Sequence, residues 1–403
     1  MISKKLYELA FEFKKIKLWS KLYDSQVFAI ELSGGEIAYC SVMGHNKEHF
    51  ALAVYIGDKG WNSFLKCASD HDGFTESQYQ ELLYSQECLQ VSFENKEMLS
   101  PEEIEGVKKY TEENGISLRG KNSWPQFMKY QKGFVPWPIS EKNDKKILEE
   151  VFERILYIED ECGFKNLYLE DFYENFTIQK FSGVKQPLKM EKLQIADSIV
   201  DEFSAEFSIS NELLDKISDS KKKRSLDCEI VMVPNPVQEN KKDVPRCPYM
   251  MLAHTSQDKL LMNPMILNLE EQSSEMLTAF ANSMLENGEI PSEISVRDIR
   301  TYKFLERFCE ETEIKLVRKD DIPVLDEIYI DLCEHFGVGS RGNDSAQELM
   351  MAQMVQMLSE MPLNELKALP KDMIKFAKSL IGTGILPSEV EIKLSNILEM
   401  GLE

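Results

Sequence analysis

Helical and strand-like patterns alternate along residues 273–336, and this alternation constrains the fold of the chain more than any other feature. The helical periodicities cover 273–286, 299–312 and 322–336, and the short apolar runs between them cover 294–297 and 314–318. Such alternation is typical of βαβ units, whose strands pair in parallel. The pattern therefore predicts a mixed α/β domain with a βαβ unit over residues 185–336.

The N-terminal part has a different pattern, in which three apolar runs follow one another closely. They cover residues 27–32, 37–43 and 50–56, and the sequence Ser-Gly-Gly-Glu at 33–36 joins the first two. Two adjacent glycines can take positive φ at both central positions of a tight hairpin. We therefore expect an antiparallel three-stranded meander with helices over residues 1–140.

A basic amphipathic helix is predicted over about residues 3–23. Its apolar positions at helical spacing are Leu6, Leu9, Ala10, Phe13 and Ile16, with lysines between them. A helix of this kind can bind a membrane surface or a partner. A second apolar flank, formed by Tyr7, Phe11, Leu18 and Leu22, favours the alternative that the helix packs into its own domain.

Length and helical patterns complete the predicted organisation. A chain of 403 residues exceeds the roughly 250–300 residues at which a single core stops growing, so at least two domains are expected. Residues 141–184 are predicted to be a connector helix and linker, and 344–403 a helical C-terminal extension. The expected fold class is α+β throughout, with an all-helical tail.

Charge and cysteine usage restrict the classes of partner. A net charge of −22 repels phosphate backbones and anionic lipid, so nucleic-acid binding is disfavoured, and no apolar run reaches the ~18 residues of a membrane span. Eight cysteines are scattered without a C-x-x-C pair, which is typical of a reduced, cytoplasmic protein. No cofactor motif lies in the structural context that its chemistry needs. Gly337–Gly342 spells G-x-G-x-x-G, but a predicted helix precedes it where a strand is required.

The candidate catalytic residues lie where the late strands are predicted to end. They are Asp298, Asp320, Asp321 and His254. Ligands of parallel α/β units lie at the carboxyl ends of strands, where carboxylates can hold a divalent ion for phosphodiester or ester hydrolysis. The alternative is helix capping, because Asp298 and Asp321 directly precede predicted helices.

Two further groups of residues are candidate binding sites. His45 and His49 flank a predicted turn near Cys40, Cys67 and His71, but nothing in the spacing fixes a third zinc ligand. Cations and aromatics interleave over residues 119–138, a combination that suits nucleic acid or an anionic ligand; they include Arg119, Lys121, Lys129, Lys132, Trp124, Phe127, Tyr130, Phe134 and Trp137. The alternative is an extended segment pinned to the domain core by its aromatics.

Methionines recur at helical spacing in the C-terminal extension. The stripe comprises Met350, Met354, Met357 and Met361. Flexible, polarisable methionines form adaptable grooves for partner peptides, although they also fill ordinary cores. The stripe therefore predicts a protein partner or self-association through these helices.

Two long stretches resemble known domains. The sequences LYELAFEFKKIKLWSKLYDSQVFAIELSGGEIAYCSVMG and RGKNSWPQFMKYQKGFVPWP resemble an uncharacterised bacterial N-terminal domain of unknown function. The stretch VPNPVQ…PRCPYMMLAHTSQDKLL…GEIPSEISVRD is similar to a second such domain that often follows it. The resemblance covers roughly residues 1–335, as expected of two domains. It implies a bacterial cytosolic protein and carries no known activity.

The sequence thus favours a non-catalytic binding or regulatory protein, or one that interacts with other proteins. The alternative is a divalent-metal-dependent hydrolase, phosphodiesterase-like or nuclease-like, centred on the strand-end carboxylates. No cofactor is expected, and whether the chain is an enzyme stays open, with the balance against it.

Overall fold

In the computed structural model the chain forms two compact units, Met1–Tyr329 and Ile330–Glu403. The residues that the structure describes are 2–69, 73–166, 169, 172, 176–182, 188–195, 203, 207–255, 259–261 and 264–336. They have an α+β fold with two mixed sheets. Gly337–Gly342 and the methionine stripe Met350, Met354, Met357 and Met361 lie outside the described residues.

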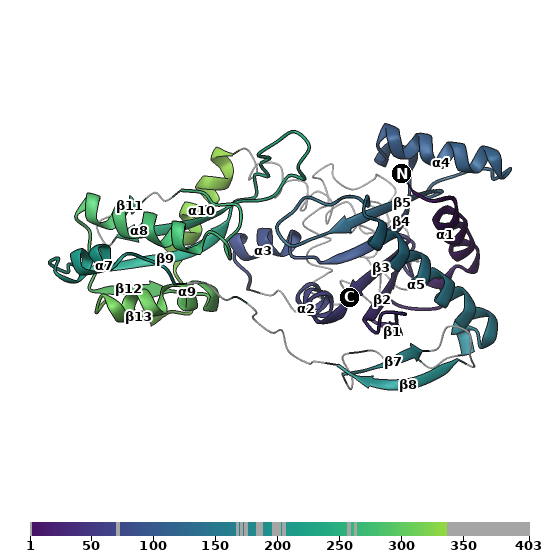
Figure 1. The fold of residues 1–403 in the computed structure, drawn as a ribbon, viewed down its shortest axis with the longest axis horizontal. Helices are drawn as coiled ribbons and strands as arrows, with labels where there is room; N and C mark the ends of the chain where they lie inside the picture. The colour runs from purple at the N-terminus through teal and green to yellow at the C-terminus, as the bar shows by residue number, and fades with distance from the viewer. Residues whose placement is uncertain are drawn as a thin grey trace, which may run out of the picture. The chain divides into compact units, whose positions relative to one another are not determined.

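The first sheet has eight strands in the order β6-β5-β4-β3-β2-β1-β7-β8 (Figure 1). Their bounds are β1 Phe28–Glu31, β2 Ile37–Met43, β3 Ala51–Ile56, β4 Cys88–Glu94, β5 Trp124–Tyr130, β6 Trp137–Pro138, β7 Thr177–Ser182 and β8 Lys189–Gln194. Neighbours pair antiparallel except β1 and β7, which are parallel. The sheet is therefore wider than the predicted three-stranded meander, because β4 to β8 extend it on both sides.

Helices cover both faces of this sheet, which explains why its central strands are apolar in succession rather than in alternation. One face packs against α1 Lys4–Ile16, α4 Pro101–Glu113 and α5 Lys142–Glu161. The other face packs against α2 Gly57–Ala68, whose Trp61 and Phe64 lie beside Tyr39 and Tyr55. The helix α3 Glu76–Leu83 follows α2 in the chain.

The segment 141–184, expected to be a connector, contributes to this first layer. Leu148, Val151, Phe152 and Ile155 of α5 are buried in the core that α1 shares. The strand β7 pairs with β1, and β8 pairs with β7. The apolar face of α5 explains why this helix packs against the sheet, because an amphipathic helix is stabilised when its apolar face is buried.

Local signals set the ends of several elements. Ser100 and Glu103 form a capping box at the start of α4, with Pro101 at the first helical position. The first helix is shorter than predicted, since Lys17 takes a left-handed conformation with φ 47° and ends α1. Leu6, Tyr7, Ala10, Phe11 and Phe13 of α1 are buried in the core, as expected for a helix packed into its domain.

The hairpin between β1 and β2 differs from the predicted two-glycine turn. Only Gly35 of the pair has positive φ, at 84°. Its N–H donates to the Leu32 carbonyl, and the Leu32 N–H donates to the Glu36 carbonyl. This is the three-residue loop with one left-handed residue that commonly connects antiparallel strands.

The second sheet has five strands in the order β11-β10-β9-β12-β13 (Figure 1). Their bounds are β9 Ser225–Met232, β10 Tyr249–Thr255, β11 Leu260–Leu261, β12 Glu293–Val296 and β13 Lys315–Arg318. The strands β9, β12 and β13 run parallel, whereas β10 is antiparallel to β9 and β11. Four helices accompany them: α7 Asn211–Ser218, α8 Ser273–Asn287, α9 Ile299–Glu311 and α10 Pro323–His335.

The second sheet has its own apolar core. Phe280 of α8, Phe304 and Phe308 of α9 and Ile217 of α7 are buried against Ile230 of β9. No described helix combines the length and the apolarity that crossing a bilayer requires.

A close approach between α2 and β3 allows a test of this packing. A Cβ atom added at Gly60 would lie 2.7 Å from the Tyr55 carbonyl carbon, which is backbone and cannot rotate away. We expect Gly60→Ala to lower the free energy of unfolding by about 1–3 kcal/mol, the usual cost of overpacking. Chemical denaturation measures the change.

The control is Gly34→Ala, because no atom lies within 4 Å of the added Cβ at Gly34. Its effect should be within about 0.5 kcal/mol, as for most surface changes. Equal stability of the Gly60→Ala variant and the wild type would contradict the packing described here.

Candidate functional site

The strand-end aspartates have different surroundings. Asp298 caps α9, since its carboxylate accepts hydrogen bonds from the Thr301 N–H at 2.8 Å and the Thr301 hydroxyl at 2.6 Å. Asp320 and Asp321 are exposed in the segment between β13 and α10. The capping alternative therefore describes the role that Asp298 has in the structure.

His254 lies away from these aspartates. In the strand register, His254 of β10 lies opposite Asp227 of β9, and Asp227 lies opposite Ser295 of β12. His254 is therefore level with Ser295, which is three positions before Asp298. Three residues of strand correspond to about 10 Å, and the two strands are not adjacent. Within the described ranges, no three His, Cys, Asp or Glu side chains could together hold a metal ion.

The carboxyl ends of the parallel strands instead gather a buried ion-pair group. The Arg297 guanidinium, after β12, donates to both carboxylate oxygens of Asp326 at 2.9 Å and to Glu229 of β9 at 2.5 Å. Arg297 is 8% exposed and Glu229 is 3% exposed. This group ties β9, β12 and α10 together, with the Tyr329 hydroxyl donating to the Met232 carbonyl nearby.

Burial dominates the electrostatics of Glu229. Desolvation raises its pKa to about 7, although the Arg297 charge acts in the opposite direction. The neighbouring Asp298 and Asp326 carboxylates raise it further. No motif marks Glu229, and the only signal in the sequence is that a lone carboxylate interrupts the apolar run Cys228–Val231.

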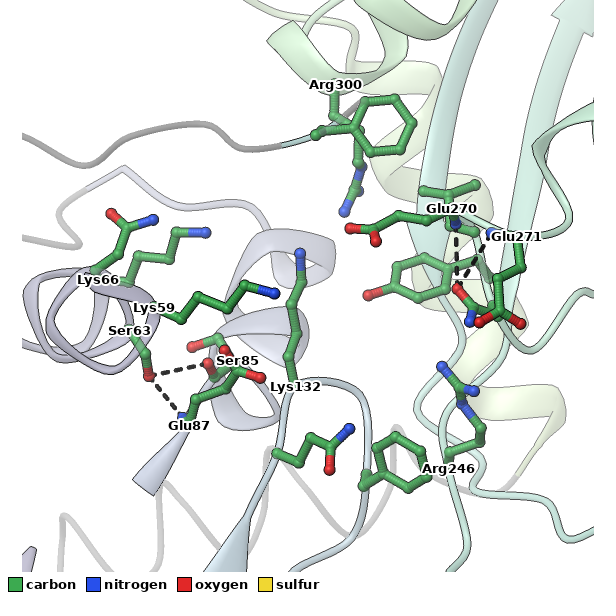
Figure 2. A pocket seen from close by; sticks show the side chains of 17 residues that line it. Lys59, Ser63, Lys66, Ser85, Glu87, Lys132, Arg246, Glu270, Glu271 and Arg300 are labelled. Carbon is green, nitrogen blue, oxygen red and sulfur yellow. Dashed lines mark hydrogen bonds between the residues drawn. The ribbon is translucent and has the colours of Figure 1, made fainter. Parts of the chain in front are cut away.

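The Met1–Tyr329 unit also contains a basic cavity of about 500 Å³, shown in Figure 2. Its lining includes five cations and three carboxylates, in a chain whose net charge is −22. The cations are Lys59, Lys66, Lys132, Arg246 and Arg300, and the carboxylates are Glu87, Glu270 and Glu271. Polar and aromatic side chains complete the lining, among them Asn62, Ser63, Ser85, Gln131, Phe134, Tyr249 and Asn268.

The lysines come from elements of the first sheet's layer. Lys59 and Lys66 project from α2, and Lys132 follows β5 in the turn before β6 (Figure 2). In the close-up, the Lys59 and Lys132 ammonium groups point into the cavity. Within the residues that the structure describes, neither Lys59 nor Lys132 forms an ion pair.

The two arginines come from the second sheet's layer and are held in place by their neighbours. Arg300 of α9 donates to Glu81 at 2.5 Å and to the Ile230 carbonyl at 2.6 Å, and it lies 5.5 Å from the Tyr249 ring centroid. Arg246 lies 4.5 Å from the Phe134 ring centroid. The cation–π contact fixes the Arg246 guanidinium without neutralising it, whereas the Glu81 carboxylate compensates the charge of Arg300.

Both arginines keep unused hydrogen-bonding capacity. The Nε atoms of Arg246 and Arg300 are buried and have no hydrogen-bond acceptor among the described residues. Burial lowers the pKa of Arg246, whereas Glu81 and Asp298 outweigh burial and raise the pKa of Arg300.

The interleaved aromatic and basic stretch contributes only part of this site. Lys132 and Phe134 line the cavity, whereas Lys129 pairs with Asp144 and Glu141 and is not among the lining residues. Phe127 is buried in the first core, Trp124 packs against that core, and Arg119 and Lys121 are exposed. Its aromatics therefore serve mainly to hold the segment in the sheet.

The described members of the histidine and cysteine group have separate partners. His45 lies against Tyr23, with ring centroids 3.8 Å apart, and its Nδ1 is 3.3 Å from the Leu22 carbonyl. His49 faces Glu94 and Gln90. Cys40 is fully buried, Cys67 is near Ser85, and His71 lies outside the described residues.

The raised pKa of Glu229 leads to a prediction about stability. Between pH 4.5 and about 7 the folded chain holds a proton that the unfolded chain has lost, so stability should fall as the pH rises through this range. Glu229→Gln removes the titration and should flatten this decline. Urea unfolding at pH 5.0 and pH 7.5 measures it, with Glu293→Gln as the control, because Glu293 is a half-buried partner of the exposed Lys315. An equal decline in the Glu229→Gln variant and the wild type would count against the assignment.

Comparisons with known proteins identify domains but no activity. Residues 4–180 match the model of a domain of unknown function (DUF7309), and residues 213–333 match that of a second domain of unknown function (DUF6930). No curated protein and no solved structure matches the chain. The chain therefore carries these two domains of unknown function in tandem.

Proposed function

We propose that the Met1–Tyr329 unit is a ligand-binding module that takes a small anionic molecule into the basic cavity. The observation that carries this proposal is the concentration of five cations around one 500 Å³ space in a strongly acidic chain. This volume lies within the roughly 300–1,000 Å³ of small-molecule sites. The role is that of a binding or regulatory protein.

Electrostatics supports an anion as the occupant. Cations that line a concave, partly desolvated surface attract anions more strongly than cations on an open surface, because less water screens them. The acidic remainder of the chain repels large polyanions such as nucleic acid, whereas a small anion can enter a local positive region.

The donors that line the cavity also suit such a ligand. Lysine ammonium groups, guanidinium groups and the Ser63 and Ser85 hydroxyls surround the space. The Ser63 hydroxyl donates to the Ser85 carbonyl and accepts from the Glu87 N–H. It therefore stabilises the cavity wall and does not bind the ligand. Charge-assisted hydrogen bonds from lysine and arginine would then provide most of the affinity.

Lys132→Gln tests the proposal, since Lys132 is exposed and forms no ion pair within the described part of the chain. Inorganic pyrophosphate is the probe, titrated calorimetrically into the full chain at low salt. We expect Lys132→Gln to weaken pyrophosphate binding about fivefold, corresponding to roughly 1 kcal/mol for one charge-assisted contact.

Lys315→Gln provides the matched control, because Lys315 is an exposed lysine on β13 that pairs with Glu293 and does not line the cavity. It should bind pyrophosphate as the wild type does. If pyrophosphate does not bind, or if the two variants weaken it equally, the cavity is not an anion site.

The carboxylates on the cavity wall give a prediction of opposite sign. Glu270 and Glu271 are exposed, so replacing them should not disturb the core. We expect the double variant Glu270→Gln/Glu271→Gln to bind pyrophosphate a few-fold more tightly at low salt, because two repulsive charges are removed. The gain should shrink in 0.5 M salt, where screening is strong. An unchanged or weaker affinity at low salt would show that the Glu270 and Glu271 carboxylates do not repel the bound anion.

A further inference from the structure

We infer that the ligand carries two or more linked anionic groups and belongs to the di- or triphosphate class. This inference rests on the proposed function and specifies the chemistry of the occupant. It depends on how the cations are distributed along the cavity rather than on their number.

The two guanidinium groups mark separate ends of the cavity. In Figure 2, Arg300 and Arg246 lie at opposite ends of the same wall. Arg300 is fixed by Glu81, the Ile230 carbonyl and the Tyr249 ring, whereas Arg246 is fixed by the Phe134 ring. Because their neighbours fix both groups, the two cannot close around one small anion without breaking these contacts.

The lysines of α2 are also spread out. Lys59 and Lys66 are seven residues apart, which puts them on one helix face about 10 Å apart along the axis. A single phosphate group can contact the cations at one end of this row but not at both. A chain of linked phosphates can span the row and present oxygens to both arginines.

The lysine between the ends supports a continuous ligand. Lys132 extends between the α2 lysines and the opposite wall in Figure 2. A linked polyanion would place negative charge beside Lys132, whereas two separate phosphates at the two ends would not. Linked groups also bind more tightly than separate ones, because the second contact is made at high effective concentration.

The test compares orthophosphate, pyrophosphate and inorganic triphosphate in the full chain by calorimetry at a fixed ionic strength. We expect triphosphate to bind at least about tenfold more tightly than orthophosphate. Lys59→Gln and Lys66→Gln should each weaken triphosphate about fivefold, whereas orthophosphate should be weakened by one of the two substitutions and not by the other.

Controls separate charge from folding. Lys315→Gln should leave all three affinities unchanged, and the melting temperature of each variant shows whether it is folded. Lys59→Arg, which keeps the charge, should restore most of the triphosphate affinity that Lys59→Gln loses.

The outcomes distinguish this inference from the proposed function. If orthophosphate binds as tightly as triphosphate, the linked-anion assignment is wrong and the anion site stands. The same conclusion follows if each of the two lysine substitutions weakens orthophosphate and triphosphate binding by the same factor. If citrate binds more tightly than triphosphate, the ligand is a polycarboxylate and the phosphate class is wrong. If none of these anions binds, both the inference and the proposed function fail.

Discussion

The ion pair between Arg300 and Glu81 is the interaction on which the site depends. Glu81 belongs to α3 in the first domain of unknown function, whereas Arg300 lies at the start of α9 in the second. The Arg300 charge outweighs burial and lowers the pKa of Glu81, so both groups stay charged near neutral pH. Because Arg300 also donates to the Ile230 carbonyl, one side chain joins α3 to β9 and forms part of the cavity wall. Residues of both domains of unknown function therefore line one cavity.

Local sequence signals predicted much of the fold, and the failures have physical reasons. The capping box of Ser100 and Glu103 at α4 is a signal of this kind, because it depends only on residues three apart. Segment 141–184 was predicted to be a connector because charges dominate α5, yet its apolar stripe is buried beside α1. The parallel pairing of β7 with β1 joins residues about 150 positions apart, and short-range patterns carry no information about such pairs.

The candidate site was harder to predict than the fold. Asp298 was considered both as a catalytic group and as a helix cap, and its bonds to Thr301 are those of a cap. Lys132 was considered as part of an anion-binding stretch and does line the cavity. Lys59, Lys66, Arg246 and Arg300 carry no motif, since three separate segments bring them together. Only the tertiary fold places a local excess of positive charge in an acidic chain.

The backbone bonds between the β5–β6 turn and the segment before β10 have a practical consequence. The Val135 N–H donates to the Pro245 carbonyl, and the Cys247 N–H donates to the Gly133 carbonyl. Recombinant production of either domain alone would leave these peptide groups facing solvent and would remove the opposite wall of the cavity. Fragments cut at the domain boundaries are thus poor substitutes for the whole chain in ligand screening or crystallisation.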